Sequence, residues 1–147
     1  MDPADERQLA VDLYNHAWTL IDLPERTAEQ EDELIHASHA SRHHWAQVGT
    51  AANLARGEWQ LSRVYAVLGR AEPALHHARR CLAYCEGSPD AIEDWDLPFA
   101  YEALARAQLV AGRAEEAGAA KARAVELGAA IADPEDREVL ENDLATL

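Results

Sequence analysis

Residues Ala55–Ser88, with the sequence ARGEWQLSRVYAVLGRAEPALHHARRCLAYCEGS, decide the fold. Two helix-forming segments lie on either side of Gly69, a residue type that can take the left-handed conformation that ends a helix. The first segment carries the large apolar residue Leu61. The second carries Ala74 and Cys81, small side chains that let it lie close against the first segment. The stretch therefore predicts two antiparallel helices joined by a tight turn.

A second copy of this pattern follows when Gly69 is matched to Gly112. Leu104 then takes the place of Leu61, and Ala117 takes the place of Ala74. The two copies are 43 residues apart, whereas regular arrays of such hairpins repeat at about 34 residues. We therefore expect the acidic insertion before Pro98 to loop out or to change the stacking angle.

The first copy resembles the tetratricopeptide repeat. The positions that match this family are Leu61, Ser62, Tyr65, Gly69, Ala74 and Cys81. The departures are Glu58 at the family's early tryptophan, Ala78 at its large aromatic residue, Pro89 for its closing proline, and Gln108 at the tyrosine of the second copy. The resemblance implies a concave surface, lined by the first helix of each hairpin, that receives a peptide or protein segment.

The resemblance also implies which residues face that surface. They are Arg56, Trp59, Gln60 and Arg63 in the first copy, with Glu102 and Arg106 in the second. Two arginines beside an exposed tryptophan could hold a carboxylate and an apolar anchor of a partner together. The alternative is that Glu102 and Arg106 form an i,i+4 pair on a solvated face, and that Trp59 packs against the first helix or the insertion.

Caps, prolines and glycines predict seven helices in all. Their expected ranges are 3–21, 28–47, 51–68, 72–85, 98–111, 114–132 and 134–145. We expect one all-α domain over residues 1–147, with an N-terminal hairpin (1–48), two repeat units (50–86 and 98–132) and a C-terminal capping helix (133–147). The fold class is therefore antiparallel helices arranged as tetratricopeptide-like hairpins.

Histidines are concentrated in the second helix. At about 100° per residue, His36, His39 and His43 share one arc of this helix with Asp32. Such a stripe can chelate a divalent transition metal such as zinc, and Asp12 and His16 of the first helix are further candidate ligands. The alternatives are a solvent-exposed stripe that needs no cofactor and a pH-responsive interface.

The composition disfavours two classes of binding partner. The formal net charge of −14 disfavours nucleic acid and anionic membranes. The start of the chain resembles no signal peptide, so we expect a cytoplasmic protein with Cys81 and Cys85 reduced. No catalytic motif is present, and an enzymatic role would depend on the histidines alone. The leading expectation is a module that binds a protein or peptide, with a homodimer as one form of that binding.

Overall fold

A computed structural model describes all residues 1–147 and shows an all-α protein with no strands. The element order is α1 (Pro3–Ile21), α2 (Ala28–Val48), α3 (Ala51–Val67), α4 (Ala71–Gly87), the 3-10 turn η1 (Pro89–Ala91), α5 (Asp96–Val110), α6 (Ala114–Gly128) and α7 (Pro134–Leu144). The predicted fold class, seven helices packed as antiparallel hairpins, is confirmed.

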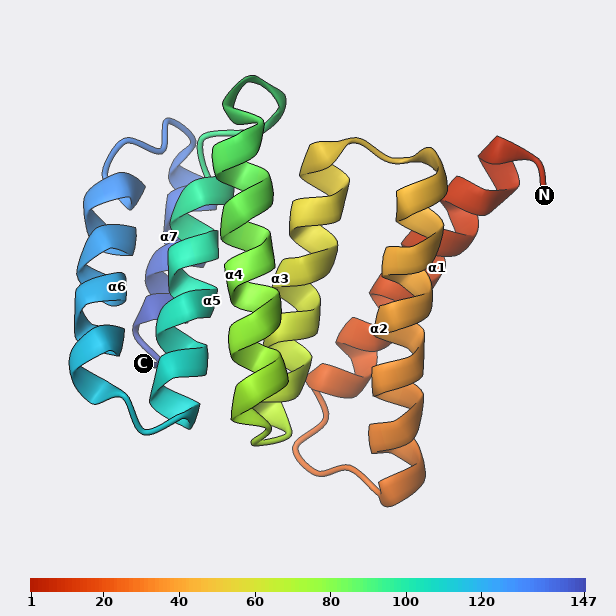
Figure 1. The fold of residues 1–147 in the computed structure, drawn as a ribbon, viewed down its shortest axis with the longest axis horizontal. Helices are drawn as coiled ribbons and strands as arrows, with labels where there is room; N and C mark the ends of the chain where they lie inside the picture. Colours follow the sequence, from red (N-terminus) through yellow and green to blue (C-terminus); the bar gives the residue numbers. More distant parts are fainter.

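The helices pair in chain order, α1 with α2, α3 with α4, and α5 with α6, and each pair packs on the next (Figure 1). Helices α1, α3 and α5 form one layer, and α2, α4 and α6 form the other. Helix α7 packs against α5 and α6, and it lies behind α5 in Figure 1. Helix α5 packs along α3 more extensively than α1 does. The first layer is therefore open between α1 and α5.

Local sequence signals set the helix starts. The Asp2 carboxylate accepts a hydrogen bond from the Ala4 backbone N–H at 3.0 Å, and Pro3 occupies the first turn of α1. Thr27 and Gln30 form a reciprocal capping box at the start of α2, with bonds of 2.9 and 3.2 Å. Each bond satisfies a donor that a helix start leaves unpaired, which is why these starts could be read from sequence.

The internal repeat is visible in the backbone. Gly69 and Gly112 have φ angles of +74° and +76°, and a side chain at either position would meet open space, so conformation alone requires glycine there. Both turns have the same hydrogen bonds: the residue after each glycine donates to a carbonyl four positions before that glycine, Arg70 to Tyr65 and Arg113 to Gln108, each at 2.8 Å.

Three helix boundaries differ from the prediction by two residues or more. Helix α4 ends at Gly87 rather than Cys85, α5 begins at Asp96 rather than Pro98, and α6 ends at Gly128 rather than Ala132. Ile131 is fully buried against Leu140 and Leu144 of α7, so the chain must leave α6 early to place it there. Gly128 permits this packing, because a Cβ atom at that position would lie 2.5 Å from Leu140 Cδ2.

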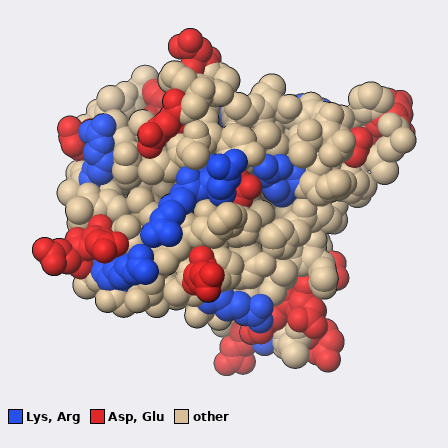
Figure 2. Space-filling view, viewed as in Figure 1, with Lys and Arg blue, Asp and Glu red and all other residues tan.

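The core is built mainly from alanine, with a few large side chains between the layers. The fully buried large apolar side chains are Leu34, Leu61, Val64, Ile131 and Leu140. Figure 2 shows Lys and Arg side chains across the middle of the face that carries α4, whereas large groups of Asp and Glu lie near the connection between α1 and α2 and beside α6. None of the helices has the length and apolar character needed to cross a membrane.

Candidate functional site

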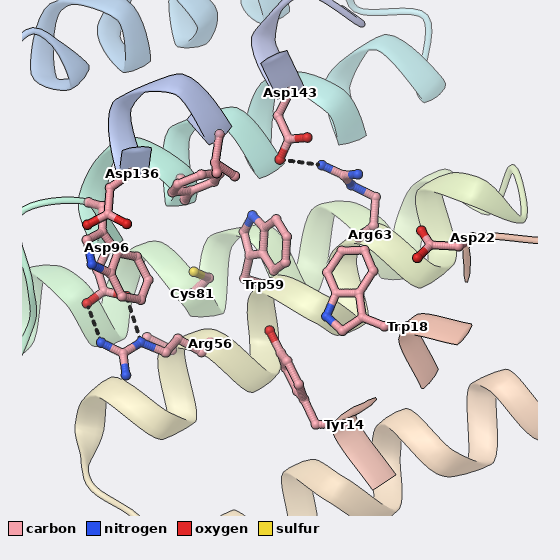
Figure 3. A pocket seen from close by; sticks show the side chains of 14 residues that line it. Tyr14, Trp18, Asp22, Arg56, Trp59, Arg63, Cys81, Asp96, Asp136 and Asp143 are labelled. Atoms are coloured by element: carbon pink, nitrogen blue, oxygen red, sulfur yellow. Dashed lines mark hydrogen bonds and ion pairs between the residues drawn. The ribbon is translucent and has the colours of Figure 1, made fainter. Parts of the chain in front are cut away.

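A pocket of about 550 Å³ lies in the opening between α1 and α5, with α3 at its base and α7 along one side (Figure 3). Its lining is mostly apolar and is shared among five helices and the segment before α5. The lining residues are Tyr14, Trp18, Asp22, Ala55, Arg56, Trp59, Arg63, Cys81, Trp95, Asp96, Phe99, Asp136, Val139 and Asp143. It lies on the layer that the repeat resemblance assigns to ligand binding.

Aromatic rings form much of the pocket wall. Trp59 is central: its ring centroid lies 5.5 Å from that of Trp18 on α1 and 5.8 Å from that of Phe99 on α5. Phe99 also meets Trp95 edge to face at 6.3 Å. Pairs at these separations are favourable beyond their burial. Burial also raises the pKa of Tyr14 above its usual value, so the Tyr14 hydroxyl stays protonated at neutral pH.

Arg56 is held by a bidentate ion pair at one side of the pocket. Its Nε and Nη2 atoms donate to the two carboxylate oxygens of Asp96, each at 3.0 Å. The guanidinium also lies over the Trp95 ring, 4.4 Å from the centroid. Asp96 is buried and additionally accepts the Glu93 backbone N–H at 2.8 Å. The ion pair therefore ties the acidic insertion to α3.

A second ionic group lies at the base of the pocket around Glu102, which is fully buried. Its carboxylate accepts hydrogen bonds from Arg63 at 2.9 Å, from Arg106 at 2.8 and 2.9 Å, and from the Trp59 indole at 3.2 Å. Arg63 also reaches Asp143 of α7 at 3.3 Å. Burial raises the pKa of Asp143, although Arg63 and Arg106 oppose that shift. The group fixes Trp59 and joins α3, α5 and α7.

The six predicted partner-binding residues divide into two sets. Arg56, Trp59 and Arg63 line the pocket. Gln60 is buried and donates to the Tyr14 carbonyl at 2.9 Å, and Glu102 and Arg106 lie behind the pocket wall. Glu102 and Arg106 do form the i,i+4 pair of the alternative, but its location on a solvated face is wrong, because the Glu102 side chain has no exposed surface. Trp59 does pack against α1, as the other part of that alternative held.

The prediction that Arg56 and Arg63 bind a carboxylate of a partner needs correction. That interpretation assumed arginines with free guanidinium groups, whereas Arg56 and Arg63 both already pair with carboxylates of this chain. A carboxylate from a partner would have to displace buried or half-buried intramolecular pairs, which is costly. The arginines therefore shape the pocket and fix its walls.

Several pocket residues were not singled out from the sequence. They are Tyr14, Trp18, Asp22, Trp95, Asp96, Phe99, Asp136, Val139 and Asp143. Tyr14 and Trp18 lie four apart on α1, a spacing that places them on one helix face and could have drawn attention to them. The α7 residues gave no such signal, because a terminal helix was expected only to cover the core.

The histidine stripe lies outside this pocket. His36, His39, His43 and Asp32 are all exposed on α2. His39 turns towards α3 and α4, where its Nε2 atom is 2.8 Å from the Tyr65 hydroxyl and its ring meets His77 at 5.6 Å. No three His, Cys, Asp or Glu side chains come together as a metal site. The geometry therefore gives the predicted metal centre no support.

The two further candidate ligands on α1 also have other partners. His16 pairs with Glu33 of α2, with 3.4 Å between His16 Nε2 and Glu33 Oε1. Asp12 accepts a hydrogen bond from Gln8 at 2.9 Å. The two helices are antiparallel neighbours, as the proposed site required, but these contacts do not lead to the stripe.

Glu58 lies beneath the histidines, buried between α2 and α4. One of its oxygens is 2.6 Å from His77 Nδ1, and the other accepts a hydrogen bond from Arg42 at 3.2 Å. Burial alone would raise the pKa of Glu58, but His77 and Arg42 outweigh it and hold the pKa below its usual value. Glu58 is thus a charged link between the two layers of helices.

We expect this region to make the fold sensitive to acid. The side of His39 that packs against α3 and α4 is partly desolvated, and this, with His77 nearby, lowers the pKa of His39 below its usual value of 6.5, although Glu58 opposes the shift. The unfolded chain therefore binds this proton more tightly. The free energy of unfolding should be highest above about pH 6.5 and should fall as the pH drops from that value through the lowered pKa of His39. It should fall further at lower pH as Glu58 is protonated. Urea unfolding between pH 8 and 4 measures both, and His39→Gln should remove the first loss alone. A midpoint that does not change between pH 7.5 and 5 would contradict this expectation.

Cys81 and Cys85 are free and buried on α4. The hydrogen bond to Cys85 and burial raise the pKa of Cys81 well above its usual value, so this thiol is a poor nucleophile although it borders the pocket.

Taken together, the contacts of the pocket describe a site with an ordered aromatic wall and buried ion pairs at its base. No protein family, curated protein or solved structure matches the chain. Function must therefore be inferred from the pocket itself.

Proposed function

We propose that the protein is a binding module of the tetratricopeptide-repeat type, and that its concave pocket receives a segment of another protein or a peptide. The observation that supports this most is the pocket of about 550 Å³ on the layer formed by α1, α3 and α5. Its volume falls within the range of about 300–1,000 Å³ that is usual for ligand sites. Five of its 14 lining residues are aromatic and two are arginines, and tryptophan, tyrosine and arginine are the residue types that dominate binding energy at protein interfaces.

The rigidity of the walls also supports binding. The Trp59 indole is fixed by Glu102, and the Arg56 guanidinium is fixed between Asp96 and the Trp95 ring. A wall that is already ordered loses little conformational entropy when a ligand enters. The pocket is also open at its rim, where Val139 is 54% exposed, so a side chain of a segment lying across the surface can reach it.

Filling the pocket from its rim should abolish binding. In Val139→Trp the new indole would occupy space next to Trp59 and Phe99, and the exposed position should leave folding intact. Val125→Trp is the matched control, because Val125 is equally exposed (54%) but lies on α6 outside the pocket. Peptides selected from a random library on the wild-type protein should bind Val125→Trp unchanged and Val139→Trp at least about tenfold more weakly, since one filled anchor pocket removes on the order of 2 kcal/mol.

The readout is the affinity of each selected peptide for the three proteins, together with the indole N–H signals of the tryptophans in NMR spectra. Binding in the pocket should shift the signals of Trp18 and Trp59. Peptides that bind Val139→Trp as tightly as wild type would place the binding surface elsewhere and reject the proposal.

A further inference from the structure

The charged side chains around the pocket can be sorted by whether they have a partner. Two arginines and four aspartates line it. Arg56 pairs with Asp96, and Arg63 pairs with Asp143 and with the buried Glu102. Arg106, behind the wall, supplies the second positive charge that Glu102 and Asp143 together require. Every positive charge at the pocket is therefore matched by a negative one.

Two carboxylates remain without a partner. Asp22, just after α1, and Asp136, in the first turn of α7, take part in no ion pair, and no side chain or backbone N–H donates a hydrogen bond to either carboxylate. Figure 3 shows them on opposite sides of the pocket, Asp136 above Asp96 and Asp22 beyond Trp18 and Arg63. The uncompensated charge of the pocket is thus negative on both sides.

The surroundings of Asp136 increase this negative field. Partial burial, followed by the nearby acidic groups Asp133, Asp94, Glu135 and Glu93, raises the pKa of Asp136 above its usual value. No arginine or lysine opposes this shift. A group whose ionisation is disfavoured by neighbouring negative charges gains from the approach of a cation.

The rings between these carboxylates suit a cation with an apolar stem. The faces of tryptophan, tyrosine and phenylalanine attract ammonium and guanidinium groups within about 6 Å. Two of the pocket tryptophans already hold arginines of this chain in that way, Arg56 over Trp95 at 4.4 Å and Arg63 over Trp59 at 5.3 Å. Trp18, Phe99 and Tyr14 complete the wall and make no such contact with an arginine or lysine.

We propose that the group this pocket selects is the lysine or arginine side chain of a bound segment, with its apolar stem against the aromatic wall and its charge attracted by the unpaired carboxylates of Asp22 and Asp136 on either side. The inference rests on the proposed function, since it names the chemistry of the ligand at the same site. The charge inferred for the ligand is positive, whereas the arginines in the sequence suggested a partner with a negatively charged carboxylate.

Three blocked peptides that differ at one position test the inference: acetyl-Phe-Lys-Phe-amide, its norleucine analogue and its glutamate analogue. Affinities are measured by NMR titration of the tryptophan indole N–H signals. The lysine peptide should bind about tenfold more tightly than the norleucine peptide, because only lysine adds a cation–π contact and attraction to the two carboxylates. The glutamate peptide should bind most weakly.

The double variant Asp22→Asn/Asp136→Asn should remove most of the preference for lysine and leave only the part that the aromatic rings supply, while the affinity for norleucine stays unchanged. Neither carboxylate holds another residue, so the double variant should fold normally, which circular dichroism checks. Asp5→Asn/Asp90→Asn is the matched control: both residues are exposed aspartates outside the pocket, and this variant should keep the full preference for lysine.

The outcomes separate the two proposals. Equal affinities for the lysine and norleucine peptides, or an unchanged preference in the Asp22/Asp136 variant, would overturn the selection of a cation while leaving a pocket that binds peptides. Failure of all three peptides to shift the signals of Trp18 and Trp59 would overturn the proposed function and the inference with it.

Discussion

Replacement of Glu102 by alanine is expected to lower the free energy of unfolding by about 3–5 kcal/mol, the usual cost of removing one partner from a buried ionic group. Glu102 is fully buried and accepts hydrogen bonds from Arg63, Arg106 and Trp59. Without it, two arginines that are 14% and 18% exposed lose the carboxylate they share. The variant should also loosen α7, because Arg63 and Arg106 both contact Asp143.

Urea unfolding followed by far-UV circular dichroism measures this loss, with Glu126→Ala as control. Glu126 pairs with Arg123 at 3.2 Å on the surface of α6, where both side chains are exposed. Such an exposed pair contributes little to stability, so Glu126→Ala should unfold close to the urea midpoint of the wild type. A loss below about 1 kcal/mol for Glu102→Ala would mean that water or Asp143 replaces the missing carboxylate, and that the group does not hold the pocket walls.

Replacement of Leu34 by alanine should cost about 2–5 kcal/mol, because it removes buried methyl groups and leaves a cavity. Leu34 on α2 has no exposed surface and packs in a cluster with Leu20, Ile21 and Val64, from α1 and α3. This cluster is where the first hairpin joins the repeat. Its loss should therefore weaken the attachment of α1, the helix that carries Tyr14, Trp18 and, just after its end, Asp22.

The same substitution at Leu109, which is 42% exposed on α5, is the matched control and should change stability by less than about 0.5 kcal/mol. The two variants are compared by their urea midpoints and slopes. Similar losses at Leu34 and Leu109 would contradict the packing described for the first hairpin.

The helix hairpins could be predicted because their signals are local. A capping box such as Thr27 and Gln30, or a glycine such as Gly69, acts on residues within one or two turns of itself. The helical faces were also predictable from periodicity, which placed His36, His39 and His43 together on α2. Where the local signal competed with packing, as at the end of α6, the prediction failed, because the burial of Ile131 is set by α7.

The pocket could be predicted only in part. The resemblance to the repeat family predicted that Arg56, Trp59 and Arg63 face one surface, because all three lie on the first helix of a hairpin, and all three line the pocket. It could not say whether those arginines were free. Their partners Asp96 and Asp143 lie 40 and 80 residues further along the chain, and no periodic pattern links such distant positions.

The stretch Ala55–Ser88 by itself determined a helical hairpin with a glycine turn and small residues at its interface, and with its copy it determined the layered fold. The tertiary structure alone decided the chemistry of the pocket, by placing Trp18 and Asp22 from the first hairpin and Asp136 and Asp143 from α7 around Trp59. The physical reason is that secondary structure depends on near neighbours in the chain, whereas the net charge of a pocket depends on which distant ions neutralise one another.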